Sequence, residues 1–173
     1  MKWWLLLGGC AVGLVGIVAV AGACLPKGHR ASRSAKFKAP PAVLWEVLTN
    51  VAAFPQWRAG VTKVEILPDA TPRKWRETGA HGAITYEQVT ADAPNRLVNR
   101  IADPGLPFGG TWTFQISAAD AGGVVTITED GEVYNVFFRF LSRFVFGYTS
   151  NLDAYLTSLG KKLGETVAIQ TES

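Results

Sequence analysis

Apolar residues recur along this chain at two different spacings. Between residues 61 and 133 they alternate with polar residues in six short runs, which is the period of half-buried strands. The clearest run is 111–117, in which Trp112, Phe114 and Ile116 share one face. The runs cover residues 61–67, 73–78, 83–90, 96–102, 111–117 and 124–133. Turns rich in Gly and Pro separate them, so we expect a mostly antiparallel sheet with one face covered.

The spacing changes to three and four residues over 136–165, which predicts a helix with one wide apolar face. Gly147 is expected to break it, so that a short aromatic helix runs into a long one. The first part is an aromatic block formed by Val136, Phe137, Phe138, Phe140, Leu141, Phe144, Val145 and Phe146. The long helix is the only predicted element large enough to cover the sheet. We therefore expect sheet and helix to enclose an apolar cavity.

The sequence before the six runs predicts one strand and two small helices. Residues 32–38 can form the strand, and the prolines that follow suit the start of a helix over 42–49. A second helical turn is expected at 51–54. The predicted fold class is therefore α+β.

The N-terminal segment carries a membrane signal. Residues 3–25 form a run of 23 residues without a charge, and about 20 apolar residues span a bilayer as a helix. We expect residues 1–26 to be a transmembrane anchor. A cleaved signal peptide and a lipoprotein signal cleaved before Cys24 remain alternatives. Cys10 and Cys24 both lie in this segment, so no disulfide framework and no cysteine metal site is expected in the domain.

Charge is distributed unevenly, although the formal net charge is +3. Residues 27–38 hold five Lys or Arg and form a predicted basic juxtamembrane arm, which leads into the first strand. One Lys precedes the apolar run, whereas five Lys or Arg follow it. The positive-inside bias therefore predicts a single-pass protein with a cytoplasmic domain. From residue 39 onward, eleven Lys or Arg face fourteen Asp or Glu, a net charge of −3. Nucleic acid is therefore not an expected partner.

Several short motifs resemble those of one family. Segment 39–49 (Ala-Pro-Pro-Ala-Val-Leu-Trp-Glu-Val-Leu-Thr) is followed by Phe-Pro-Gln-Trp at 54–57 and by Gly-Gly-Thr-Trp at 109–112. Segments 93–97 and 125–131 fall in the same order. Over about residues 32–165, the chain resembles the polyketide cyclase/dehydrase-like branch of the START/Bet v 1-like (SRPBCC) superfamily, which leaves 166–173 as a tail.

This resemblance implies a helix-grip fold, in which a seven-stranded antiparallel sheet curls around the C-terminal helix with a ligand cavity between them. Members bind hydrophobic ligands such as lipids, sterols, quinones or polyketides. Few are proven enzymes, and the family shares no catalytic set.

The strand faces predict which residues line the cavity. The expected ligand-binding residues are Trp75, Asn99, Trp112, Phe114 and Tyr148, with Glu77 and Glu129 as weak catalytic candidates. Burial would raise the pKa of either carboxyl and could provide an acid or base for enolisation or cyclisation. The alternative is an ordinary hydrogen-bonded strand residue near the rim of the cavity.

Other chemistry has little support in the sequence. The chain has no Gly-x-Ser-x-Gly elbow, so a hydrolase with a serine nucleophile is not expected. It also has no Gly-rich phosphate loop, so no phosphate-binding site of that kind is expected. His29 lies in the arm and His81 in a turn, which makes a metal site improbable. We expect no metal and no cofactor.

Three functions remain open. The leading hypothesis is a membrane-tethered domain that binds a hydrophobic small molecule or lipid in the cavity. The first alternative is a cyclase or dehydratase that uses a cavity carboxylate, Glu77 or Glu129, and a desolvated carboxylate pair would favour it. The second is a protein-interaction module, which a cavity too small for a ligand would favour. The aromatic block is expected either to pack in the core or to lie in the membrane interface with Arg139 and Arg143.

Overall fold

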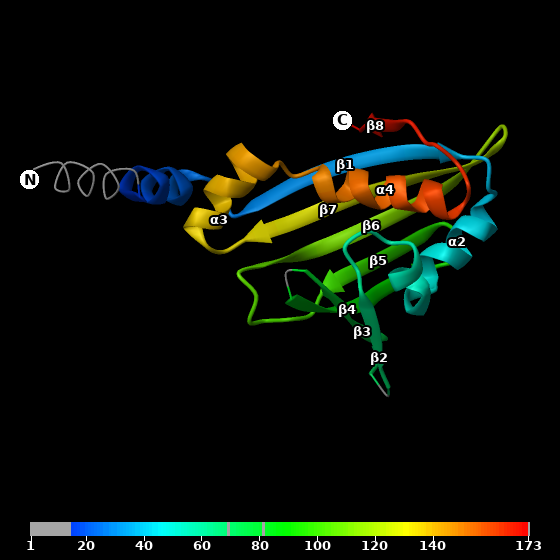
Figure 1. Cartoon of the computed structure of the whole chain (residues 1–173), viewed down its shortest axis with the longest axis horizontal. Helices are drawn as coiled ribbons and strands as arrows, with labels where there is room; N and C mark the ends of the chain where they lie inside the picture. Colours follow the sequence, from blue (N-terminus) through cyan, green and yellow to red (C-terminus); the bar gives the residue numbers. More distant parts are fainter. Residues whose placement is uncertain (1–14, 69, 81, 173) are drawn as a thin grey trace, which may run out of the picture.

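The computed structural model describes residues 15–68, 70–80 and 82–172 (Figure 1). The predicted order of elements is confirmed: one strand, two short helices, six strands and a helical C-terminal segment, to which a last short strand is added. The elements are β1 (Gly28–Phe37), α2 (Pro41–Thr49), the 3-10 helix η1 (Val51–Gln56), β2 (Lys63–Leu67), β3 (Lys74–Gly79), β4 (Gly82–Asp92), β5 (Arg96–Ile101), β6 (Phe108–Ala119), β7 (Gly122–Val133), α3 (Val136–Leu141), the π-helix η2 (Ser142–Phe146), α4 (Ser150–Lys162) and β8 (Ile169–Thr171).

The strands form one antiparallel sheet in the order β2-β3-β4-β5-β6-β7-β1-β8. The sheet has eight strands, so the prediction of seven was wrong. The additional strand is β8, which lies in the predicted tail and pairs with β1. Arg33 on β1 donates to the hydroxyl of Thr171 at 2.9 Å. Without β8, β1 would be a long open edge, which proteins usually cover.

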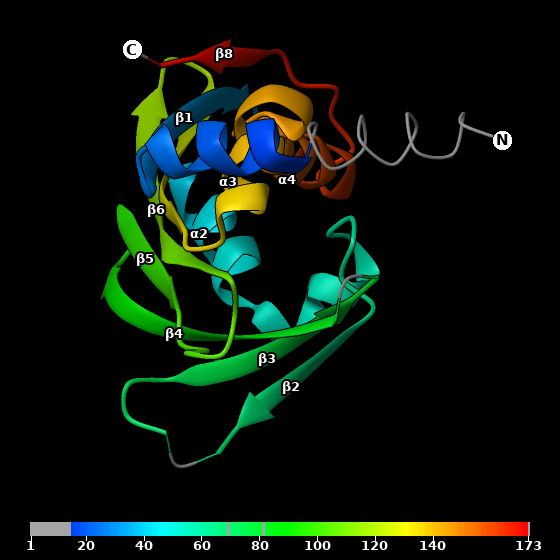
Figure 2. The ribbon, with the colours of Figure 1, turned by 90° about the vertical axis from the view of Figure 1, so that its left-hand side faces the viewer.

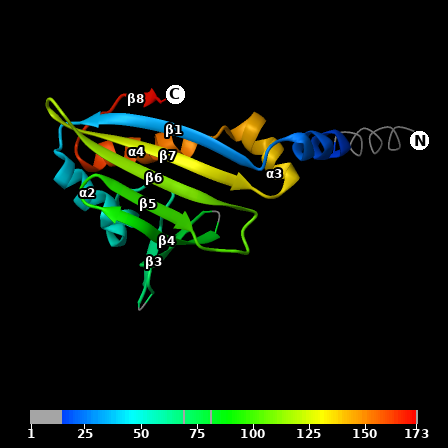
Figure 3. The ribbon, with the colours of Figure 1, turned by 180° about the vertical axis from the view of Figure 1, so that it is seen from behind.

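Sheet and helix pack as the helix-grip prediction requires. The sheet curves, and α4 lies across its concave face, while α2 and η1 close one end (Figures 1 and 3). Leu152, Leu156 and Leu159 of α4 are fully buried. They share one core with Val125 and Ile127 of β7. Together with Tyr155, these leucines place four buried apolar residues on one face of α4 within two turns. This apolar face explains why α4 packs on the concave side of the sheet.

The C-terminal helical segment breaks where the sequence predicts. Gly147 has a φ of 73°, in the left-handed region that favours glycine, and it separates η2 from α4. The side chain of Asn135 caps α3 by accepting from the N–H groups of Phe137 and Phe138.

Core packing of the aromatic block, one of its two predicted fates, is wrong for most of its residues. Phe137, Phe138, Phe144, Val145 and Phe146 are 40–62% exposed. The reason is placement, because α3 and η2 lie beyond the end of α4 (Figure 1), beside the helix formed by residues 15–24 (Figures 1 and 2). Of the C-terminal helical segment, only α4 lies over the sheet (Figure 1).

The N-terminal segment differs partly from expectation. Of the predicted anchor, residues 1–14 lie outside the described residues, and no helix within the described part is long and apolar enough to cross a membrane. The first strand begins at Gly28, four residues earlier than predicted. Cations of the predicted arm therefore belong to the sheet, where Arg33 pairs with Asp153 at 2.9 Å and Arg30 with Asp130 at 3.3 Å.

Candidate functional site

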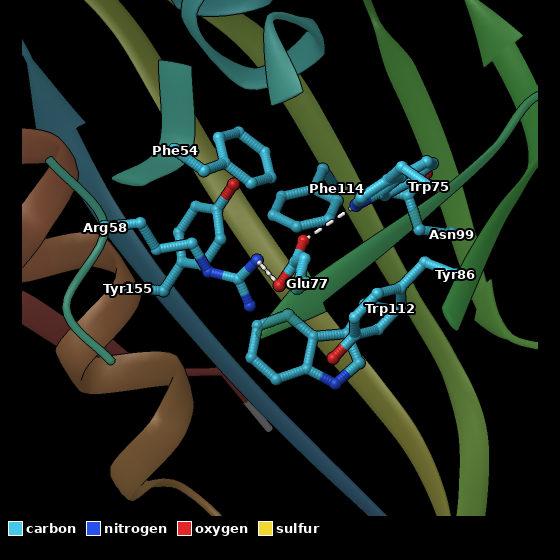
Figure 4. Close-up of a pocket in the computed structure, with 9 residues that line it drawn as sticks. All are labelled: Phe54, Arg58, Trp75, Glu77, Tyr86, Asn99, Trp112, Phe114 and Tyr155. Atoms are coloured by element: carbon cyan, nitrogen blue, oxygen red, sulfur yellow. Dashed lines mark hydrogen bonds and ion pairs between the residues drawn. The ribbon is translucent and has the colours of Figure 1, made fainter. Parts of the chain in front are cut away.

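A small interior pocket lies between the concave face of the sheet, η1 and α4 (Figure 4). The strands contribute side chains that point inward by the period-2 rule, and α4 contributes from its buried face. The nine residues that line it are Phe54, Arg58, Trp75, Glu77, Tyr86, Asn99, Trp112, Phe114 and Tyr155.

Aromatic rings form most of the walls. Tyr155 of α4 lies at the centre, with ring centroids 5.3 Å from Phe114, 5.9 Å from Trp112 and 6.4 Å from Phe54. Across the pocket, Trp75 stacks on Tyr86 at 5.8 Å, because these two residues are directly opposite each other on β3 and β4. These distances fall in the range of favourable aromatic pairs, so the walls pack tightly.

A buried ion pair sits inside this aromatic cage. Arg58 Nη1 donates to Glu77 Oε2 at 2.6 Å, and Trp75 Nε1 donates to Glu77 Oε1 at 2.8 Å. The Glu77 residue is only 6% exposed. The guanidinium also lies 4.8 Å from the ring centre of Tyr155 and 5.2 Å from that of Phe54, within cation–π range.

The loop after η1 carries Arg58 into the interior. The Arg58 N–H donates to the Phe54 carbonyl at 2.8 Å, which closes a tight turn at the end of η1. The next residue, Ala59, donates its N–H to Ser158 Oγ on α4 at 3.2 Å. The loop is therefore held against the helix, and Arg58 is fixed between α4 and the sheet.

Burial and charge together set the protonation states in the pocket. Burial lowers the pKa of the Arg58 guanidinium, but the Glu77 carboxylate, Tyr155 and Tyr86 together outweigh burial, and the pKa is raised above its ordinary value. Burial raises the pKa of Tyr86 to about 12 and also raises the pKa of Tyr155. The pocket therefore holds a cation and two neutral phenols that can donate hydrogen bonds at neutral pH.

Two buried polar atoms near the pocket find no partner among the described residues: Asn99 Oδ1 and Trp57 Nε1. The Asn99 residue lines the pocket and is 8% exposed. Buried polar atoms are nearly always hydrogen-bonded, because leaving one unpaired costs about 1–3 kcal/mol. Asn99 Oδ1 is therefore an acceptor available to a guest or a water molecule.

The pocket is much smaller than the predicted apolar hollow. Its volume is about 20 Å³, which is room for roughly one water molecule. The predicted cavity between the sheet and α4 is therefore present only as a pocket too small for a hydrophobic small molecule. The reason is that the aromatic side chains predicted to line a space fill it instead.

The structure brings five of the seven predicted site residues together. Trp75, Glu77, Asn99, Trp112 and Phe114 all line the pocket.

Glu129 and Tyr148 do not line this pocket and meet His29 instead. The His29 ring stacks on Tyr148 with centroids 4.0 Å apart, and its Nε2 lies 3.8 Å from Glu129 Oε1. No paired carboxylates therefore form in the described pocket, whose nine lining residues include one carboxylate, Glu77. His81 lies outside the described residues.

Four lining residues were not predicted: Phe54, Arg58, Tyr86 and Tyr155. Tyr155 falls on the apolar face of the predicted long helix, and Tyr86 alternates into the sheet face that meets Trp75, so both could have been found by period alone. Arg58 lies in a loop without periodicity, and nothing in its local sequence indicates that it turns inward.

Comparison with known proteins decides the family. The family model described as polyketide cyclase / dehydrase and lipid transport matches residues 28–164. The chain belongs to this family. The match covers strands β1 to β7, the closing helices and α4, and it supports the resemblance seen in the sequence. No curated protein sequence matches the chain.

Solved structures of this family's fold are similar in shape but distant in sequence. A conserved protein from Geobacillus kaustophilus has a TM-score of 0.66 at 13% identity and covers 82% of this chain and 99% of its own. Protein MLL2253 from Mesorhizobium loti has a TM-score of 0.62 at 16% identity, with 79% and 97% covered. The Zhui aromatase/cyclase from Streptomyces sp. R1128 has a TM-score of 0.60 at 18% identity, with 76% and 91% covered. At these identities the likeness shows the fold alone.

Proposed function

We propose that this chain binds a hydrophobic small molecule with an oxygen-containing head group between the sheet and α4. The observation that carries the proposal is Asn99 Oδ1, which has no partner among the described residues and lines the same aromatic-walled pocket as the buried Arg58–Glu77 pair. Small-molecule sites commonly combine apolar walls with a few fixed polar groups. The guanidinium would face an acceptor oxygen of the guest, and Asn99 Oδ1 would accept from a hydroxyl.

The guest would enter by displacing side chains, because the pocket holds only about one water in the described conformation. Trp112 and Tyr86 are half-buried, whereas Trp75 and Phe114 are almost completely buried. The first two are therefore the rings that would swing aside. Such a closed, unliganded conformation shifts toward an open one when a ligand prefers the open form.

We further propose that the N-terminal apolar run tethers the domain to a membrane, with the domain on the cytoplasmic side. The support is the 23-residue uncharged stretch and the five cations that follow it. A tethered domain would take a lipid-like guest from the adjacent bilayer.

The small pocket also favours a second candidate, a protein-interaction module that needs no guest. The enzyme alternative has less support, because both oxygens of Glu77 already accept hydrogen bonds from Arg58 and Trp75. A carboxylate held in this way is not free to take a proton from a substrate.

Extraction of the purified full chain with organic solvent, followed by mass spectrometry, tests the proposal. We expect the wild-type protein to release a hydrophobic species with an oxygen head group, and Trp112→Asp to release at least roughly tenfold less, since a buried charge opposes an apolar guest. Gln115→Asp is the matched control, because Gln115 is an exposed residue of the same strand. Equal recovery from both variants, or no recovery from folded wild-type protein, would favour the interaction module.

Asn99→Leu gives a second test that needs no identified guest. The substitution keeps the size of the side chain and removes the unpaired acceptor. We expect the free energy of unfolding to rise by about 1 kcal/mol while the amount of extracted guest falls. A residue that only supports the fold would not show gain of stability and loss of binding together.

A further inference from the structure

The helical segment formed by α3 and η2 carries exposed apolar side chains that do not line the interior pocket. Four phenylalanines (Phe137, Phe138, Phe144 and Phe146) are 40–62% exposed, and together they expose on the order of 400 Å² of ring surface. Val145 adds to it at 61% exposure. Apolar patches of this size on a monomer often mark an interaction site.

The charges around this surface suit an anionic lipid. Between Glu132 and Asp153 the chain has no carboxylate and two arginines, Arg139 and Arg143. Arg143 is exposed beside the phenylalanines in the sequence. Lys27, the residue before β1, is also exposed, and its carbonyl accepts from the Val133 N–H. Exposed aromatic rings flanked by cations are typical of segments that lie in the membrane interface.

The described end of the N-terminal apolar run, residues 15–25, lies directly beside this surface. Arg139 is buried and donates to the carbonyls of Gly22 and Leu25 at 3.3 Å and to those of Val133 and Tyr134 at 2.8 and 2.9 Å. The end of the helix formed by residues 15–24 is therefore held against α3. Val15, Ile17 and Val20 of that helix are 55–66% exposed. Residues 15–25, the described part of the uncharged run, and the phenylalanine surface are thus neighbours in space (Figures 1 and 2).

We propose that α3 and η2 dock on the surface of an anionic lipid bilayer, with the phenylalanines in the headgroup–acyl boundary. The proposal rests on the membrane tether proposed above and adds a fixed contact to it. The N-terminal helix and its Arg139 contacts give the domain one attachment to the membrane, and docking would add a second. Docking at α3 and η2 would hold one end of the α4–sheet layer against the lipid from which a guest would come.

Lipid quenching of a site-specific fluorophore tests this docking in the full chain. Cys10 and Cys24 are replaced by Ser, and an environment-sensitive fluorophore is placed at Phe144→Cys. The protein is reconstituted in vesicles of phosphatidylcholine and phosphatidylglycerol, with or without brominated acyl chains. We expect brominated lipid to reduce the emission roughly twofold at this position. The matched control is Val89→Cys, an exposed apolar position on β4, where emission should not change.

The outcomes separate the docking from the other proposals. Protein that floats with the vesicles but shows no quenching at Phe144→Cys keeps the tether and overturns the docking. Equal quenching at both positions also overturns the docking. A shift of the emission that depends on protein concentration and occurs without quenching would overturn it too, because it would indicate that a second copy of the chain covers the surface. Protein that does not float overturns both tether and docking. None of these readouts depends on a guest in the interior pocket.

A reporter at Phe138→Cys provides the complementary test. Phe144→Asp with Phe146→Asp should abolish quenching at this reporter, because two carboxylates in the interface oppose insertion next to anionic lipid. Val89→Asp should leave the quenching unchanged. Since all three substituted side chains are largely exposed, neither variant is expected to unfold the domain.

Discussion

Glu77 is the residue on which the polar part of the interior pocket depends. Its two oxygens accept from Arg58 and Trp75, and the ion pair is almost completely enclosed. Glu77→Gln would leave the Arg58 charge buried without a counter-ion. We expect the free energy of unfolding to fall by about 3–5 kcal/mol, measured by denaturant titration.

The exposed pair Lys63–Glu65 is the matched control, since both side chains are more than half exposed. Glu65→Gln should cost less than about 1 kcal/mol. The double variant Arg58→Met with Glu77→Leu should recover most of the loss, because an apolar pair of similar volume avoids burying charge. A Glu77→Gln protein as stable as the Glu65→Gln control would contradict the view that the pair is a buried ion pair.

At this residue scale, the sequence predicts which face a side chain takes but not where along the strand it meets another element. Trp75, Asn99 and Phe114 alternate inward as expected and converge in the pocket. Glu129 also faces inward, but it lies closer to the α3 end of β7 and meets His29 instead. Arg58 reaches the pocket from a loop, where no periodicity exists to indicate direction.

At the scale of elements, Gly147 decides where the aromatic turn ends and α4 begins. Its φ of 73° is strained for any residue with a Cβ, although no atom lies within 4 Å of the position that a Cβ would take. Gly147→Ala should therefore reduce the free energy of unfolding by about 1–2 kcal/mol through backbone strain alone, measured by thermal or denaturant unfolding.

Gly105→Ala is the control, because its added Cβ also meets no atom within 4 Å but its backbone is not left-handed. It should change stability by less than about 0.5 kcal/mol. Equal effects at Gly147 and Gly105 would show that the left-handed turn does not constrain the break between η2 and α4.

The order and type of the elements could be predicted because each has a clear period or a breaking residue. Two features could not. Period alone shows that the α3–η2 segment has apolar positions, but it does not show whether a partner covers them. β8 has only three residues, too few for alternation to be recognised, and it forms because β1 offers an open edge.

At the scale of the whole molecule, Arg139 connects the N-terminal helix to the domain. Its guanidinium donates to four backbone carbonyls, two from residues 22 and 25 and two from the end of β7 and the residue after it. Arg139→Met would keep the apolar stem and remove these donors. We expect amide hydrogen exchange to increase in residues 15–27 while the central strands β6 and β7 remain protected, since carbonyls that lose their partners favour local opening.

Arg143→Met is the matched control for Arg139, because Arg143 lies one turn further along and is exposed. It should leave exchange in residues 15–27 unchanged, whereas lipid quenching at the Phe144→Cys reporter should weaken through the lost cation. The two arginines then separate two roles: Arg139 fixes the angle between the apolar run and the domain, and Arg143 contributes to contact with the lipid. Unchanged exchange in Arg139→Met would mean that α3 and the N-terminal helix are held together by packing alone, and the docked orientation would not depend on this side chain.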